Sequence, residues 1–137
     1  MPSQNPRPAK DAAARAFNQF EMADFTIGAE GSDTINVAVQ LKDARGRAVA
    51  VPVGAKVYLS GAATGLGLGT ATTSALAIGT NGTLLDITTT GKVCSVLSDA
   101  SGRFDLNIIQ TAAPITVYLV IIKPDGGLII SGAITFA

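Results

Sequence analysis

The sequence of 137 residues predicts an all-β fold, an antiparallel β-sandwich preceded by an N-terminal arm. About eight or nine short apolar segments alternate with turns rich in Gly, Asn and Asp, a spacing typical of sandwiches. Residues 34–42 carry Ile, Val, Val and Leu at every second position, which predicts a strand with one apolar face. Residues 115–122 and 128–136 are joined by Lys-Pro-Asp-Gly-Gly and therefore predict a C-terminal β-hairpin.

Composition argues against several classes of protein. Ten basic and ten acidic residues give no net charge, whereas an electrostatic nucleic-acid binder needs a basic surplus. Trp is absent and other aromatic residues are few, so we expect no stacking platform for bases or sugars. The first residues carry no apolar secretory segment, and no apolar run reaches the ~20 residues of a membrane span. We therefore expect synthesis in a cytoplasm, with neither nucleic acid nor a membrane as partner.

Residues 1–23 are predicted to form the arm. Residues 1–8 carry three prolines, which favour an extended chain. Residues 9–20 are rich in helix-forming residues, and three apolar side chains fall at i, i+4 and i+7 on one stripe of a short helix. This helix either docks on a partner subunit, packs on its own domain or frays. The candidate partner-binding residues of the arm are Arg7, Lys10, Ala13, Phe17 and Phe20.

The β-sandwich domain is predicted to span residues 24–137, and its strands are apolar runs or alternating segments between turns. Pro52 places one segment at a sheet edge, because proline cannot donate to a ladder. Residues 115–122 are apolar at almost every position and predict a central strand covered on both faces. Residues 61–82 predict a long, mostly exposed loop with a brief apolar cluster. The nine predicted strands are 25–27, 34–42, 47–53, 55–60, 83–89, 92–97, 104–109, 115–122 and 128–136, and the apolar cluster of the loop, 76–78, is a candidate for a further brief strand.

The sequence identifies no catalytic, cofactor-binding or metal-binding residue. His, the commonest general base near neutral pH, is absent. Cys94 is the only Cys and is predicted to be a small core residue. Asp43, Asp99 and Asp125 lie in predicted turns, where Asp accepts hydrogen bonds from its local backbone. The glycines of residues 65–69 lack the strand–helix context of a phosphate loop. We therefore expect no cofactor and no enzymatic activity.

Two stretches of the chain resemble a recurring pattern in small virion proteins of tailed phages. Residues 35–46 read INVAVQLKDARG and are followed by AKVYLS at residues 55–60. The C-terminal part contains VYLV, KPDGG and SGAITFA. Over residues 33–137 the chain is thus similar to immunoglobulin-like head-decoration or head-fibre proteins of bacteriophages. It departs from true immunoglobulin domains because it lacks their core Trp and second Cys.

The resemblance implies an immunoglobulin-like sandwich with a structural function. Such a protein decorates or cements the outer capsid surface through protein–protein contacts with the major capsid protein or other virion subunits. It is assembled in the host cytoplasm, resides in the virion and forms a homo-oligomer such as a trimer. Alternatives are a phage tail or fibre component, a carbohydrate-binding sandwich that contacts a host surface, and a hydrolase on the same scaffold. Few aromatic residues argue against the carbohydrate module, and the lack of His argues against the hydrolase.

Overall fold

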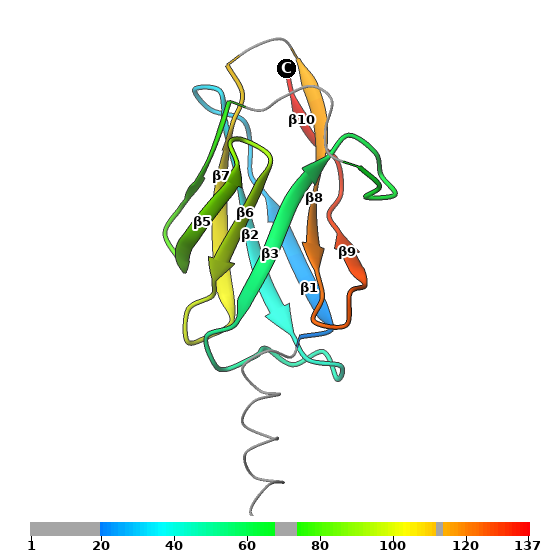
Figure 1. Cartoon of the computed structure of the whole chain (residues 1–137). Coiled ribbons are helices and arrows are strands. Elements are labelled where there is room, and N and C mark those ends of the chain that lie inside the picture. Colours follow the sequence, from blue (N-terminus) through cyan, green and yellow to red (C-terminus); the bar gives the residue numbers. More distant parts are fainter. Residues whose placement is uncertain (1–19, 68–73, 112–113) are drawn as a thin grey trace, which may run out of the picture.

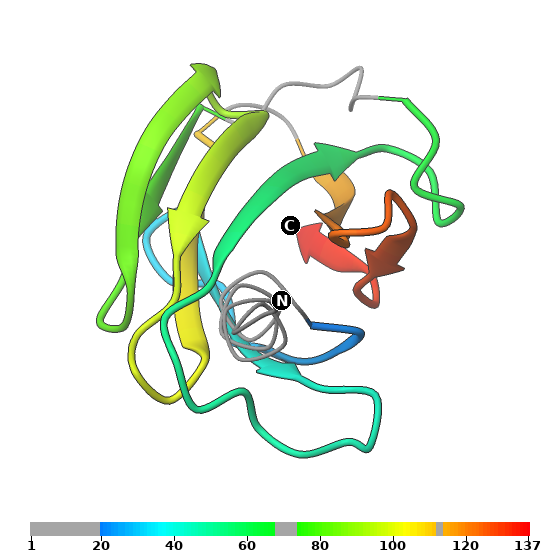
Figure 2. The ribbon, with the colours of Figure 1, turned by 60° about the horizontal axis from the view of Figure 1, so that its bottom comes forward.

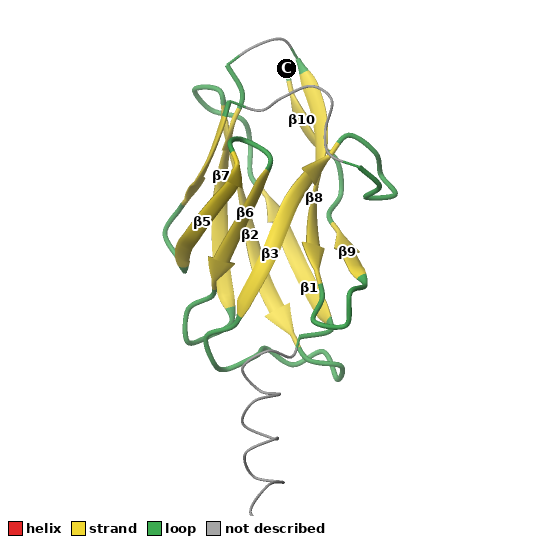
Figure 3. Ribbon diagram, in the orientation of Figure 1, coloured by secondary structure: helices red, strands yellow, loops and turns green. Residues whose placement is uncertain are grey.

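The computed structural model describes residues 20–67, 74–111 and 114–137, which form two antiparallel β-sheets packed face to face (Figure 1). These residues contain only strands and loops (Figure 3), and hence no helix that could cross a membrane. The predicted helix of residues 9–20 lies outside them except for its last residue. The strands are Met22–Ile27 (β1), Thr34–Lys42 (β2), Gly54–Ser60 (β3), Ala75–Ile78 (β4), Thr83–Thr89 (β5), Val93–Leu97 (β6), Arg103–Ile109 (β7), Ile115–Ile122 (β8), Leu128–Ile130 (β9) and Ile134–Phe136 (β10).

The two sheets have four and six strands. The first has the order β1-β2-β7-β4, and the second has β10-β8-β3-β6-β5 with β9 also paired to β8. β9 and β10 share one edge of β8, because β3 occupies the other. Ser131, in the segment between β9 and β10, continues the hydrogen bonding to β8. Its Oγ accepts from the Leu119 N–H, and its own N–H donates to the Leu119 carbonyl. Figure 2 shows both layers from the end at which the described chain begins.

The core lies between the sheets and is filled by alternate side chains of the strands. As predicted, the apolar residues of β2 and β7 that face inward are all buried. β8 is central, as predicted, but the prediction that both of its faces are covered is wrong: of its outward residues Val120 is buried, whereas Thr116 is exposed. Val120 is covered because Gly65, in the loop after β3, lies close against it. The inward residues are Ile35, Val37, Val39 and Leu41 on β2, and Phe104, Leu106 and Ile108 on β7.

The predicted edge strand of residues 47–53 is wrong. These residues form a loop that makes one isolated bridge, between Lys42 and Ala48. The loop is anchored by the buried Val49, whose N–H donates to the Leu41 carbonyl at 3.1 Å. β2 and β3 belong to different sheets, so the connection must cross the end of the sandwich. A segment that crosses between layers cannot at the same time extend a ladder in one of them.

Three turns share one backbone design and lie at the same end of the sandwich (Figure 1). In each, the first N–H donates to the carbonyl four residues later, and a Gly with positive φ stands at the fourth position, as in three-residue turns with a glycine bulge. The aspartates have the predicted local role. Oδ1 of Asp43 and of Asp99 each accepts two backbone N–H groups, and Oδ1 of Asp125 accepts one. The three glycines are Gly46, Gly102 and Gly126.

Replacing Gly102 with alanine is expected to be more destabilising than the same change at Gly46. Both residues have positive φ, which costs an L-residue about 1–2 kcal/mol. A Cβ on Gly102 would also lie 2.3 Å from the Val49 carbonyl oxygen. A Cβ on Gly46, by contrast, would have no neighbouring atom within 4 Å. We expect urea denaturation to show losses of about 1 kcal/mol for G46A and about 3 kcal/mol for G102A. Equal losses would contradict the steric argument.

Candidate functional site

The predicted partner-binding residues divide between the undescribed arm and the core. Arg7, Lys10, Ala13 and Phe17 lie outside the described residues. Phe20 is described, and its side chain is only 1% exposed within the core of its own domain. The sandwich also begins before the predicted residue 24, because β1 starts at residue 22. The side chain of Phe20 is therefore occupied inside the sandwich, and any partner contact by the arm must come from residues before it.

The two outer faces of the sandwich differ in chemistry. The outer face of the four-stranded sheet, which we call the polar face, consists mainly of charged, amide and hydroxyl side chains. Strand pairing places these residues on the side opposite the core. The polar residues of this face are Asp24, Thr26, Thr34, Asn36, Gln40, Lys42, Arg103, Asp105 and Asn107.

The outer face of the six-stranded sheet, which we call the apolar face, is turned toward the viewer in Figure 1. Its strands place only two charged residues outward, Lys56 on β3 and Asp86 on β5. Its remaining polar side chains are hydroxyls. Most of its apolar side chains are partly exposed, and Leu128 reaches 38%. The apolar side chains of this face are Tyr58, Val93, Leu97, Tyr118, Val120, Ile122, Leu128 and Ile130.

Residues 61–67 cover one side of the apolar face. The Tyr58 hydroxyl donates to the Gly65 carbonyl. Gly65 has a φ of +74°, and a Cβ there would lie 2.9 Å from Ile130 Cδ1. Ser60 lies on the outward side of β3 but is buried beneath this loop, and its Oγ accepts from the Ala62 N–H at 3.1 Å. The loop therefore packs tightly on β8 and β9, while its Leu66 side chain remains 73% exposed at the border of the face.

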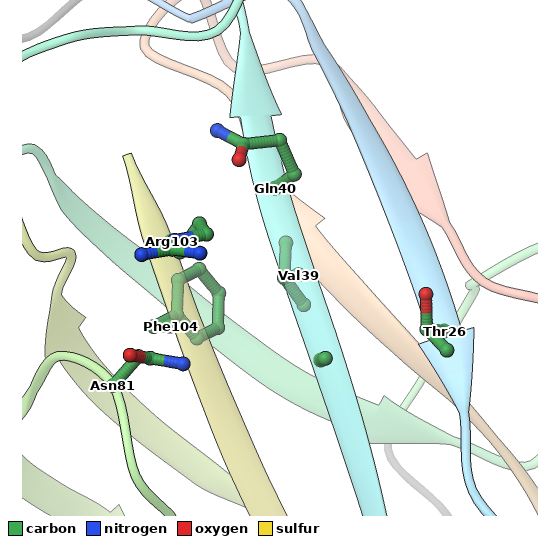
Figure 4. A pocket seen from close by; sticks show the side chains of 7 residues that line it. Thr26, Val39, Gln40, Asn81, Arg103 and Phe104 are labelled. Carbon is green, nitrogen blue, oxygen red and sulfur yellow. The ribbon is translucent and has the colours of Figure 1, made fainter. Parts of the chain in front are cut away.

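The polar face contains a shallow depression of about 180 Å³ (Figure 4). Its polar groups are largely engaged in local contacts. Gln40 Nε2 donates to the carbonyl of Ser101 at 2.9 Å, and Arg103 Nε lies 3.6 Å from the Asp99 carboxylate. These contacts stabilise the neighbouring turn and leave the depression without a convergent set of ligand-binding groups. Its lining residues are Thr26, Ala38, Val39, Gln40, Asn81, Arg103 and Phe104.

Asp105 on β7 is a structural residue that the sequence did not single out. It is 5% exposed, and its carboxylate accepts from the N–H groups of Thr80 at 3.0 Å and Asn81 at 2.6 Å and from Asn36 Nδ2 at 2.7 Å. Burial raises the pKa of Asp105, but the hydrogen bonds from Asn81, Thr80 and Asn36 outweigh burial and leave this pKa below its ordinary value. Gly79 is required beside it, because a Cβ there would lie 1.9 Å from Oδ2. Asp105 thus fixes the connection between β4 and β5.

The described residues contain no arrangement that resembles a catalytic or metal centre. Among them no three His, Cys, Asp or Glu side chains lie close enough together to hold a metal ion. Cys94 is buried, as predicted, and burial raises the pKa of its thiol to about 11. A thiol in this state is a core side chain and a poor nucleophile.

Comparison of the chain with protein-family models, curated proteins and solved structures returned no significant match. The surface chemistry of the sandwich is therefore what indicates its function. Its two outer faces differ: the polar face carries most of the charged groups and all of the amide groups, as expected of a solvated sheet, whereas the apolar face carries one amine and one carboxylate.

Proposed function

We propose that this chain is a structural subunit of a tailed-bacteriophage virion, which decorates or cements the outer capsid surface through protein–protein contacts and has no catalytic role. The observation that carries the proposal is the apolar face, where two tyrosines and several aliphatic side chains share one sheet surface with a single amine and a single carboxylate. An exposed apolar patch of this kind marks a protein-binding surface. The resemblance of residues 33–137 to head-decoration and head-fibre proteins is the reason for choosing a tailed-phage virion as the particle.

An immunoglobulin-like topology is part of the proposal. The order β1-β2-β7-β4 corresponds to strands A-B-E-D of a constant-type immunoglobulin domain. In the second sheet, β9 and β10 together correspond to strand G, β8 to strand F and β3 to strand C. β5 and β6 extend the second sheet beyond β3, where variable-type domains have two additional strands. Here these two strands follow β4 in the chain, whereas in variable domains they precede strand D. The likeness is therefore one of layout, with a different connection.

The test is binding of the chain to the particles of the phage that encodes it. We expect the full chain to cosediment with heads at a saturable, fixed stoichiometry. We further propose that the helix predicted in the arm docks on the particle and anchors the sandwich, so a variant that lacks residues 1–18 should show an unchanged thermal transition but lose most of this binding. The deletion ends before Phe20 so that the core and the Glu21–Lys42 backbone hydrogen bond remain.

Separate incubation with heads and tails distinguishes the main alternative. Cosedimentation with tails alone would favour a tail or fibre component. Failure of the full chain to bind either structure would contradict the virion proposal. Unimpaired binding of the truncated variant would move the anchoring contact from the arm to the sandwich, where the apolar face is the first surface to mutate.

A further inference from the structure

The two charges of the apolar face have opposite signs and lie in one row across the sheet. Asp86 on β5 is paired with Ser95 on β6, and Ser95 is paired with Lys56 on β3. At the usual strand spacing the Cα atoms of Asp86 and Lys56 therefore stand about 10 Å apart, one on each side of β6. In the described structure the two side chains form no ion pair with each other. Both residues are exposed.

We propose that the apolar face packs against the same face of a second copy, about a two-fold axis that runs along β6 above Ser95. This inference rests on the proposed function only in taking the apolar face as a binding surface, and it names the partner. Rotation about this axis places Lys56 of each copy opposite Asp86 of the other. Each charge is thus paired with an opposite charge of the other copy, and the face is complementary to itself, as a two-fold interface requires. An axis along β3 would instead bring the two Lys56 side chains together.

The apolar residues near the axis fit the same arrangement. Val93 and Leu97 both point outward from β6, so each copy's β6 presents aliphatic side chains to the other's. In the row next to the charges, Thr89, Val93 and Tyr58 lie side by side, so the axis places Tyr58 over Thr89 of the second copy. The zero net charge of the chain removes long-range repulsion between copies.

The extent of the overlap sets the strength of the pairing. The three strands that meet, β5, β6 and β3, span about 14 Å across and about 20 Å along, a projected area of about 300 Å² per copy. A standard stable interface buries about 800 Å² per partner. We therefore expect a reversible, concentration-dependent dimer.

The test is a charge exchange followed by sedimentation equilibrium of the full chain at low ionic strength, where surface ion pairs are least screened. Wild-type protein should dimerise as its concentration rises. Lys56→Glu and Asp86→Lys should each raise the dimer dissociation constant by about tenfold or more, because each brings like charges together twice. An equimolar mixture of the two variants should recover association, since the introduced carboxylate of one variant then meets the introduced amine of the other. The unchanged Asp86 and Lys56 of the two chains form the second pair.

Arg45→Glu is the matched control. It changes the net charge by the same amount as Lys56→Glu, but at an exposed turn after β2, in the other sheet. It should leave the dissociation constant unchanged, and thermal unfolding of every variant verifies that the fold is intact. A monomeric wild type, a dimer insensitive to both reversals, or a mixture that stays monomeric would overturn the proposal. A monomer that still cosediments with heads overturns the pairing alone, whereas a charge-dependent dimer that ignores heads and tails supports the pairing and counts against the virion function.

Discussion

Replacing Phe20 with alanine is expected to lower the free energy of unfolding by about 3–5 kcal/mol, the usual cost of truncating a buried phenylalanine. Phe20 is the first residue that the structure describes, yet it ranks among the largest fully buried side chains. Truncation would leave a cavity between the sheets that the flanking strands cannot close. Guanidinium denaturation of the full chain, analysed by linear extrapolation, measures the loss.

Met22→Ala is the control for this experiment. Met22 lies two residues further along the chain, and its side chain is 46% exposed on the outward side of β1. Its truncation should change the free energy of unfolding by no more than about 0.5 kcal/mol. Similar small losses for both variants would contradict the burial of Phe20 and return it to the partner-facing stripe predicted from the sequence.

The Asp105→Asn variant is expected to lose about 2–3 kcal/mol of stability, because the replacement directs an amide NH₂ toward buried donors that the carboxylate now satisfies. Asp99→Asn is the matched control. Asp99 accepts two backbone N–H groups in an exposed turn, a role that Asn also fills, so we expect a loss below about 0.5 kcal/mol. Thermal and urea unfolding of both variants at neutral pH measure the difference.

Acidification provides an independent check on Asp105. Its pKa in the folded state lies below the ordinary value, so the stabilisation is complete above the unfolded-state pKa of about 3.9. It is lost as the pH falls through the lower folded-state pKa. The stability difference between wild type and Asp105→Asn should thus be constant near neutral pH and shrink below about pH 4. A difference that widens in acid would show that another group dominates.

Local patterns were sufficient to predict most of the strands. β2 and β7 each bury one face against the core, so the alternation of apolar and polar residues in their sequence matches the alternation of buried and exposed side chains. The turn at Asp99 was equally visible, since its backbone contacts lie within four residues. The loop of residues 47–53 was mispredicted as an edge strand. Pro52 shows only that one backbone N–H is missing, which fits a loop as well as it fits a sheet edge. Whether the next strand joins the same sheet or the opposite one depends on pairings far along the chain.

The candidate surfaces could not be read from the sequence for the same reason. Asp86, Ser95 and Lys56 form a row only because β6 lies between β5 and β3. Asp105 is buried because a turn 25 residues earlier in the chain closes over it. Phe20 matched the helical spacing of the arm, but the strand that follows it pairs with β2 and carries it into the core.

The single thiol of the chain makes the protein convenient for spectroscopy. Cys94 is its only cysteine, and complete burial together with a raised pKa shields the sulfur from maleimides and methanethiosulfonates at neutral pH. One engineered surface cysteine would therefore be the only labelled position, with no background thiol to remove. A spin label or fluorophore on the exposed Thr83 of β5 would report distances between copies, or from one copy to a particle, in an otherwise unmodified sequence.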